Sequence, residues 1–385
     1  MTELPDGFAA HVANVGVKDH TDDFVVITAD RPVPAAGVFT RSRFVGPSVE
    51  ISRSHLADRR ARAIVIVSKN ANVANGPTGT DDATELVDGV AGRLGCEPAD
   101  VLVASTGVIG RRYPMDRIRA GIRAIPAAPH GRSADDAAAG IMTTDTVPKV
   151  AETTVAGSNA RVVGIAKGVG MIEPDMATMI AVVCTDADVS PDELDTTFRA
   201  AVDRTFNCVS IDTDTSTSDT AVVLASGAAG PVDAHAFATA LEQVCLDLTK
   251  MIALDGEGAE TLIEVIVDGA RDHRQAKRVA KSIVNSPLVK TAVHGADPNW
   301  GRVAMAVGKC SDDLDIDQDR VVIAFCGTEV YPTPVDDAAL AALSDEMRSD
   351  VVPIHVSLGI GSGAATVYGC DLTDGYVRIN ADYTT

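Results

Sequence analysis

The sequence predicts a mixed α/β fold built from layers of helices and strands. Short β-branched runs alternate along the chain with longer stretches whose apolar residues recur at helical spacing. Single strands that alternate with helices favour α/β or mixed α+β layers over a pure sandwich or a helix bundle. The chain has 385 residues and neither an internal repeat nor a low-complexity segment. We therefore expect two or three domains, or one large layered domain.

The first half supplies the clearest buried strands. Ala63–Ser68 and Val101–Ala104 are continuous apolar runs, which is typical of strands covered on both faces. Between them, Asp81–Gly95 carries leucine and valine at helical spacing, and a further helix is expected from Pro114 onward. The stretch Pro126–Arg132 is rich in proline and is expected to be a loop.

The rest of the chain continues this alternation. Asp233–Leu254 is the strongest helical pattern, and a basic helix is expected over Asp272–Val284. Shorter apolar runs predict further strands at Val162–Ala166, Met179–Cys184, Leu262–Val267, Arg320–Cys326, Val351–Leu358, Ala365–Tyr368 and Tyr376–Asn380. Because a strand gives way to a charged helix near Asp268–His273, we expect one domain over residues 1–270 and a smaller one over 271–385.

Charge and composition exclude several classes of protein. The 33 basic and 54 acidic residues give a net charge of −21, whereas nucleic-acid and anionic-membrane binders carry a basic face. No run is long enough to span a bilayer, and the first residues lack the pattern of a signal peptide. The seven scattered cysteines form neither a disulfide framework nor a zinc motif, which favours a reducing cytoplasm.

One candidate catalytic residue is Thr178, which precedes an expected strand. The segment before it, from Lys167, contains two glycines, a proline and three charged residues. A threonine hydroxyl is a poor nucleophile unless a base activates it, and its own α-amine can serve if the Ala177–Thr178 bond is cut. From spacing alone, a tight structural connection is the favoured interpretation of this segment.

A second candidate follows the expected strand Val101–Ala104. Thr106 and Gly107 could supply a hydroxyl and a backbone amide to an oxyanion hole, although a strand-to-helix turn also needs glycine. The polar run Ser210–Asp219 could line a site or cap a turn. It fails as a calcium loop, because Thr217 stands where the pattern requires glycine.

A third region, Asn285–Arg302, contains the only tryptophan beside polar residues and an arginine. Its histidine, His294, is expected to be hydrogen-bonded in the fold rather than to bind metal. No H-E-x-x-H motif and no G-x-S-x-G turn is present, so zinc hydrolysis and histidine-based serine chemistry have no support.

Several long motifs, in order, resemble one family over essentially the whole chain. They are A-S-T-G-V-I-G (104–110), I-M-T-T-D-T (141–146), A-K-G-V-G-M-I-E-P-D-M-A-T-M (166–179), D-G-E-G-A (255–259), L-V-K-T-A-V-H-G-A-D-P-N-W-G-R (288–302) and the terminal Y-G-C-D-L-T-D-G-Y-V-R-I-N-A-D-Y-T-T. The chain is similar to the ornithine acetyltransferases, or glutamate N-acetyltransferases, which are self-cleaving N-terminal-nucleophile enzymes. This resemblance favours the functional interpretation at each candidate site.

The resemblance implies a role for each matching residue. The precursor cuts itself between Ala177 and Thr178, and Thr178 becomes the nucleophile that accepts the acetyl group. Thr106 and Gly107 match the oxyanion-hole pair of the family. The remaining matches are its substrate-binding positions, Thr143, Lys167, Glu257, Asn380 and Thr385. Lys167 suits an α-carboxylate, and Glu257 suits the side-chain ammonium of ornithine.

The implied reaction is ping-pong transfer of acetyl from N-acetyl-ornithine to glutamate, without metal or cofactor. The implied fold is an αββα layered sandwich with a smaller C-terminal α/β domain, whose tail returns to the active site. Family members are cytoplasmic and assemble as α2β2 heterotetramers from the two cleaved chains.

One departure concerns the pathway. The common arginine-pathway enzymes carry D-G-D before S-T-N-D, whereas this chain has D-T-D-T-S-T-S-D over 212–219. This segment looks more like that of the paralogue found in clavulanic-acid-type biosynthetic clusters, so a role in primary arginine synthesis and the acetyl acceptor stay open. No feature of the sequence decides whether acetyl-CoA is also a donor, and we expect a monofunctional enzyme. Two alternatives remain open: a self-cleaved aminopeptidase or amidohydrolase, and a catalytically silent paralogue.

Overall fold

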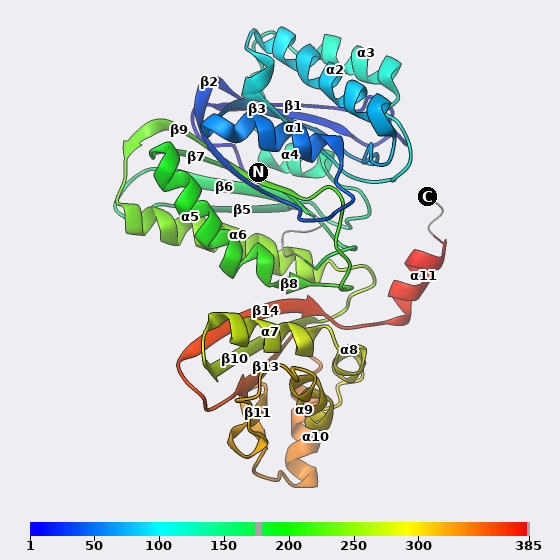
Figure 1. Ribbon diagram of the computed structural model, residues 1–385, viewed down its shortest axis with the longest axis vertical. Helices are drawn as coiled ribbons and strands as arrows, with labels where there is room; N and C mark the ends of the chain where they lie inside the picture. Colours follow the sequence, from blue (N-terminus) through cyan, green and yellow to red (C-terminus); the bar gives the residue numbers. More distant parts are fainter. Residues whose placement is uncertain (174–178, 383–385) are drawn as a thin grey trace. The chain divides into compact units, whose positions relative to one another are not determined.

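The structure, a computed structural model, describes residues 1–173 and 179–382 (Figure 1). The chain folds as two compact units. Among the described residues, the first contains Met1–Asn207 and Asp214–Leu248, and the second contains Cys208–Thr213 and residues 249–382. This division differs from the expected one at residue 270, because the strand Leu262–Ala270 pairs inside the sheet of the second unit.

The first unit is built on a single mixed sheet whose strands run in the order β4-β3-β2-β9-β7-β6-β5, with β1 beside β2. Its strands are β1 (Phe8–Ala13), β2 (Phe24–Phe39), β3 (Arg60–Val67), β4 (Val101–Ser105), β5 (Lys149–Thr154), β6 (Arg161–Lys167), β7 (Ile180–Asp188) and β9 (Thr220–Pro231). The long strand β2 pairs with β1 and β3 through its first half and with β9 through its second half. It therefore belongs to both halves of the sheet.

These two sheet halves pack face to face, with helices on their outer faces. The helices of this unit are α1 (Pro47–His55), α2 (Gly76–Leu94), α3 (Met115–Ala124), α4 (Ala134–Gly140), α5 (Pro191–Arg204) and α6 (Ala234–Leu254). Along β3, Ile64 and Ile66 face a core shared with β6, β7 and β9, while Val65 and Val67 face α2 and α3. On β6, Gly164 lies against Val244 of α6. The layers are thus αββα, as expected, and the apolar run of β3 follows from burial on both faces.

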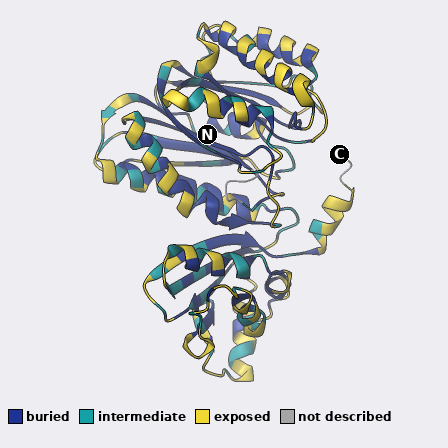
Figure 2. Cartoon of the chain, viewed as in Figure 1, coloured by how far each residue is buried: buried dark blue, intermediate teal, exposed yellow. Residues whose placement is uncertain are grey.

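The second unit has a six-stranded mixed sheet in the order β12-β11-β13-β10-β14-β8. Its strands are β8 (Val209–Ser210), β10 (Leu262–Ala270), β11 (Val322–Phe325), β12 (Thr328–Tyr331), β13 (Val351–Ser357) and β14 (Gly363–Cys370), and its helices are α7 (His273–Val284), α8 (Pro287–His294), α9 (Trp300–Gly308), α10 (Asp337–Glu346) and α11 (Asp374–Asp382). Helix α7 buries Val279 and Ile283 against the sheet and leaves its basic residues outside, so its amphipathic sequence accounts for its place (Figure 2).

One predicted element is wrong. Tyr376–Asn380 was expected to be a strand, but it lies in helix α11. In this five-residue segment, the apolar positions 376, 377 and 379 fit the two-residue period of a strand as well as the 3.6-residue period of a helix. Periodicity alone therefore could not distinguish a strand from a helix. Four of the seven thiols are buried, while Cys96, Cys310 and Cys326 are partly exposed. Among the described helices, none combines the length and apolarity needed to cross a membrane.

Candidate active site

Thr106 and Gly107 lie directly after β4, at the carboxyl end of the parallel pair β3–β4. Gly107 has a φ of +130°, and a Cβ atom there would lie 2.2 Å from the carbonyl carbon of Lys69, so only glycine fits. Within the described residues, the Gly107 amide has no hydrogen-bond acceptor, whereas the amide of Thr106 donates to the carbonyl of Val67. The Gly107 amide is therefore available to a ligand, as an oxyanion-hole donor must be.

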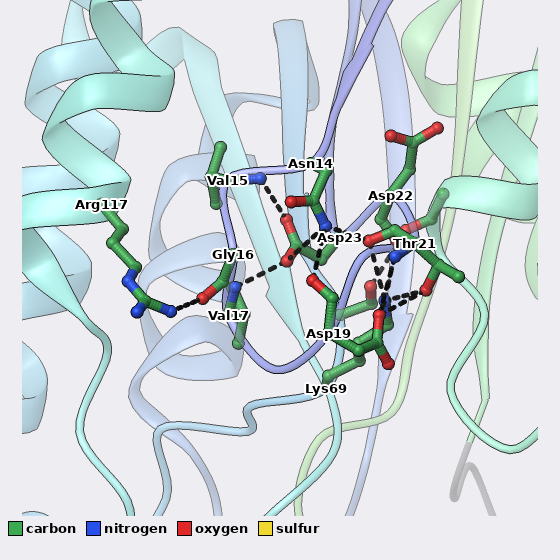
Figure 3. Close-up of polar contacts among 12 residues, drawn as sticks. Asn14, Val15, Gly16, Val17, Asp19, Thr21, Asp22, Asp23, Lys69 and Arg117 are labelled. Atoms are coloured by element: carbon green, nitrogen blue, oxygen red, sulfur yellow. Dashed lines mark hydrogen bonds and ion pairs between the residues drawn. The ribbon is translucent and has the colours of Figure 1, made fainter.

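The backbone that supports Gly107 is itself anchored by a buried lysine (Figure 3). Lys69 has a left-handed backbone (φ 72°), and its Nζ donates to Asp19 Oδ1 at 2.8 Å and to the carbonyl of Thr21 at 3.0 Å. Hydrogen bonding from Lys69 holds the pKa of Asp19 below its ordinary value. Asp23 stabilises the same loop by accepting hydrogen bonds from the backbone amides of Val15 and Val17. This network fixes the surface against which Gly107 packs.

Replacing Gly107 with alanine tests this fit. We expect Gly107→Ala to reduce the yield of folded protein or to remove acetyl transfer, because backbone atoms rather than a movable side chain block the new Cβ. Gly110→Ala is the matched control, since that glycine also has a positive φ but has no atom within 4 Å of an added Cβ. The thermal unfolding temperature and the transfer rate are measured for both variants and compared with those of the parent protein. An active, normally stable Gly107→Ala enzyme would contradict the assignment.

Lys167 supplies a positive charge next to Thr106. It ends β6, it is buried, and its Nζ lies 3.2 Å from the hydroxyl oxygen of Thr106. In the ladder, Lys167 pairs with Ile180, the first residue of β7. Lys167 therefore lies beside the start of the strand that follows Met179, which is next in sequence to the expected nucleophile.

A buried carboxylate, Asp145, organises the residues around Lys167. Its Oδ1 accepts from the Lys149 ammonium at 2.8 Å and from the Gly168 amide at 2.7 Å. Its Oδ2 accepts the amide of Thr143 at 3.0 Å. Burial opposes ionisation of Asp145, but the charges of Lys167 and Lys149 outweigh it and hold its pKa below the ordinary value. The carboxylate thus stays charged and fixes the loops that carry Thr143 and Gly168.

A second carboxyl, Asp219, has the opposite electrostatic character. It is buried immediately before β9, and neither of its oxygens has a hydrogen-bond partner at good geometry among the described residues. Burial raises its pKa well above the ordinary value, although the Thr40 hydroxyl, the Met179 amide and the charge of Lys167 act against that rise. The folded protein therefore holds the Asp219 proton up to a higher pH than the unfolded chain does.

This difference predicts a pH-dependent gain in stability for Asp219→Asn. Because the pKa of Asp219 is raised by folding, its stability contribution is present below the unfolded pKa, near 3.8, and is lost as the pH rises toward the folded value. We expect Asp219→Asn to be more stable than the parent protein by about 1 kcal/mol or more at pH 7. Urea unfolding at pH 4 and pH 7 measures this. An equal difference at both pH values would contradict the linkage.

The second unit holds two further predicted residues in contact. The amide nitrogen of Asn380, on α11, donates to Glu257 Oε2 at 2.9 Å. Gly258 makes this possible, because an added Cβ would lie 2.3 Å from the amide nitrogen of Tyr376. The expected cleavage residues Ala177 and Thr178, and the terminal Thr385, lie outside the described residues.

The predicted residues therefore form one group in the first unit, Thr106, Gly107, Thr143 and Lys167, and a contacting pair in the second. Lys69, Lys149 and Asp145 were not among the predicted residues, and Asp219 was included only as the last residue of the polar run Ser210–Asp219. Asp145 lies in the quoted motif I-M-T-T-D-T, where a single acidic residue among threonines was the available signal. His294 is hydrogen-bonded as expected: it contacts Asp371 at 3.0 Å. Glu260 lies near this pair, but two backbone amides also bind Asp371, which is typical of a structural contact.

Fold, site and sequence similarity together define the class of protein: a mixed α/β acyltransferase of the glutamate N-acetyltransferase kind. The chain belongs to the ArgJ family, whose model matches residues 9–385. The arginine biosynthesis bifunctional protein ArgJ 2 of Nostoc sp. is 56% identical over 384 residues, covering 100% of this chain and 99% of the relative. The glutamate N-acetyltransferase Oat2 of Streptomyces clavuligerus is 57% identical over 391 residues, with coverage of 100% and 98%.

Among solved structures, the arginine biosynthesis bifunctional protein argJ from Bacillus halodurans is 42% identical, with a TM-score of 0.49. The match covers 52% of this chain and 98% of that one.

Proposed function

We propose that this glutamate N-acetyltransferase cuts itself between Ala177 and Thr178 and then transfers acetyl from N2-acetyl-L-ornithine to L-glutamate through Thr178. The observation that carries this proposal is the available amide of Gly107, which lies after β4 beside Thr106 and the buried Lys167. A backbone donor held by steric fit next to a hydroxyl and a cation suits the negative charge that develops during acyl transfer.

The proposed chemistry needs only the chain, its substrates and water. The Thr178 hydroxyl attacks the carbonyl of Ala177, an ester forms as the C–N bond breaks, and the α-amine of Thr178 is set free. Water then hydrolyses the ester, which releases the Ala177 carboxylate and restores the Thr178 hydroxyl. That amine, with an ordinary pKa of about 7.7–8.0, then takes the hydroxyl proton of Thr178 as it attacks N-acetyl-ornithine. Ornithine leaves with a proton, and the α-amine of glutamate attacks the acetyl ester and regenerates Thr178.

The substrate contacts follow the charges of the site. Lys167 binds the α-carboxylate that both substrates share, and Thr143 lies with it in the network of Asp145. Glu257, held by Asn380, binds the side-chain ammonium of ornithine. Thr385 completes the set by the family resemblance.

Acetylation of the enzyme tests the function directly. Mixing the mature protein with N-acetyl-ornithine alone is expected to add one acetyl group to the chain that begins at Thr178, and glutamate is expected to remove it as N-acetyl-glutamate. Rapid release of acetate without glutamate would instead establish a hydrolase. No acetylation at all would establish a silent paralogue. Acetyl-CoA as the sole donor separates a monofunctional enzyme from a bifunctional one, a choice that relatives at 56% and 57% identity leave open.

Removing one oxyanion donor gives a quantitative prediction. Thr106→Ala is expected to lower kcat by about 10²–10³, since one such donor contributes about 2.7–4 kcal/mol. KM for N-acetyl-ornithine should change little, because the hydroxyl acts mainly in the transition state. Steady-state kinetics measure both constants, and Thr144→Ala provides a control at another threonine. A Thr106→Ala enzyme with raised KM and normal kcat would contradict the role.

The proposal includes a cytoplasmic α2β2 assembly of the two cleaved chains. Its support is the family resemblance of the sequence. Light scattering of the purified protein, combined with separation of the two chains under denaturing conditions, measures the stoichiometry.

A further inference from the structure

A small cavity in the second unit contains charged side chains of both signs. It has a volume of about 190 Å³ and lies where the segment after β8, the end of α6, the start of α8 and the connection from β14 to α11 meet. Its lining includes the acidic residues Asp212, Glu257 and Asp371 and one cation, Lys290. Glu257 is the residue already proposed to bind the ornithine ammonium, so this cavity is where a substrate side chain would end.

Lys290 is the unusual member of this lining. It lies on α8, in the L-V-K-T-A-V-H motif, and only 4% of its surface is exposed. Its ammonium donates one hydrogen bond, to the carbonyl oxygen of Cys370 at 2.6 Å, and the described residues offer it no carboxylate at ion-pair distance. An ammonium has three donors, and burial of a charge without a counter-charge is costly. Lys290 is therefore a buried cation whose remaining donors suit an anionic group.

Two of the three carboxylates in this lining accept hydrogen bonds from other groups. Asp371 is occupied elsewhere: its Oδ1 accepts the amides of Glu260 and Thr261, and its Oδ2 contacts His294. Glu257 accepts a hydrogen bond from Asn380.

The two substrates of the proposed reaction have side chains that end in opposite charges. In ornithine, the side chain ends in an ammonium nitrogen four bonds from Cα. In glutamate, it ends in carboxylate oxygens that are also four bonds from Cα. Because both substrates present the same α-carboxylate and the same α-nitrogen to the reacting centre, their side-chain ends occupy the same place in turn. That place requires a carboxylate for one substrate and a cation for the other.

We propose that Lys290 binds the γ-carboxylate of glutamate in the second half of the reaction, in the cavity where Glu257 binds the ammonium of ornithine in the first half. This inference rests on the proposed function. It assigns Lys290 as the residue that determines acceptor specificity. It also explains why a lysine, rather than a neutral residue, bonds the Cys370 carbonyl.

Chase experiments on the acetyl-enzyme separate the two half-reactions. The mature protein is acetylated with N-acetyl-ornithine, freed of ligand, and mixed with either glutamate or ornithine, and loss of the acetyl group is followed by mass. The main variant is Lys290→Gln, which removes the charge but keeps a donor for the Cys370 carbonyl. Lys290→Met also removes that donor, and Glu257→Gln is the matched variant of opposite charge.

We expect Lys290→Gln to slow the glutamate chase at subsaturating concentration by about 10- to 100-fold while the ornithine chase stays within a few-fold of the parent. Glu257→Gln should show the reverse pattern. Equal slowing of both chases by Lys290→Gln, or slowing of neither, would overturn the proposal. Those results would make Lys290 only a contact between α8 and β14.

The parent enzyme provides a test that does not depend on the folding of a variant. Glutamine has the size of glutamate without the charge, so the parent acetyl-enzyme should prefer glutamate over glutamine by about 10-fold or more, and Lys290→Met should lose that preference. Equal rates for the two acceptors in the parent would overturn the inference. Failure of the parent to form an acetyl-enzyme would instead overturn the proposed function, so the two failures are distinguishable.

Discussion

Thr178→Ala is expected to remain a single uncut chain with no acetyl transfer. The same hydroxyl starts cleavage of the Ala177–Thr178 bond and later carries the acetyl group, so its removal stops both steps. The loss should exceed that of any other substitution considered, because Thr106, Gly107 and Lys167 can stabilise charge but cannot form the acetyl ester. Denaturing electrophoresis and a transfer assay on the purified variant measure the two effects.

Thr178→Ser is the matched control for this prediction. Serine keeps the hydroxyl and the α-amine, so we expect cleavage and transfer to persist, although more slowly. A cut and active Thr178→Ala protein would contradict the mechanism. So would a Thr178→Ser protein that is cut and normally folded but does not form the acetyl ester.

Asp145→Asn is expected to cause the largest loss of stability, about 3–5 kcal/mol. The Lys149 side chain is 1% exposed and pairs with Asp145 at 2.8 Å, so the substitution removes a carboxylate that balances a buried ammonium. Transfer should also fall by about 10-fold or more, since the Thr143 and Gly168 amides lose a charged acceptor. Urea unfolding and kcat/KM measure the two consequences.

The pH dependence of this effect follows from the direction of the pKa shift. The folded pKa of Asp145 is depressed, so its contribution is present above the unfolded value near 3.8 and is lost as the pH falls through the folded value. The parent and Asp145→Asn proteins should therefore converge in stability only below about pH 4.

A double variant isolates the buried pair. Asp145→Asn combined with Lys149→Met removes both charges of the pair, and it should be more stable than Asp145→Asn alone, because the buried ammonium is removed together with the carboxylate that balanced it. If the stability loss of the double variant equalled the sum of the losses of the two single variants, the proposed coupling between Asp145 and Lys149 would be contradicted.

The sequence predicted the layered core well, because strands that are buried on both faces appear in it as continuous apolar runs. The apolar runs of β3 and β4 and the helical spacing in α2 were confirmed nearly to their ends, with α2 beginning at Gly76 rather than Asp81. The place of Thr106 and Gly107 followed from the end of β4. By contrast, the strand predicted at Tyr376–Asn380 is wrong, since a short amphipathic run does not distinguish the two periods.

The supporting residues of the site could not be predicted in the same way. Lys69 acts through a left-handed backbone and a loop about 50 residues earlier in the chain, and such contacts leave no local pattern. The hydrogen bonds of Asp145 reach Gly168 across 23 residues. The shortage of hydrogen-bond partners for Asp219 within the described part of the chain depends on how β7 and β9 pack. Motif resemblance marked the positions that we propose to touch substrate, whereas burial and charge revealed the residues that hold those positions in place.

The intact mass of the denatured, purified protein tests the central claim most directly. Self-processing predicts two chains, of residues 1–177 and 178–385, the second of which begins with Thr178. A single species of 39.9 kDa in native, mature protein would contradict the claim that Thr178 becomes an N-terminal nucleophile.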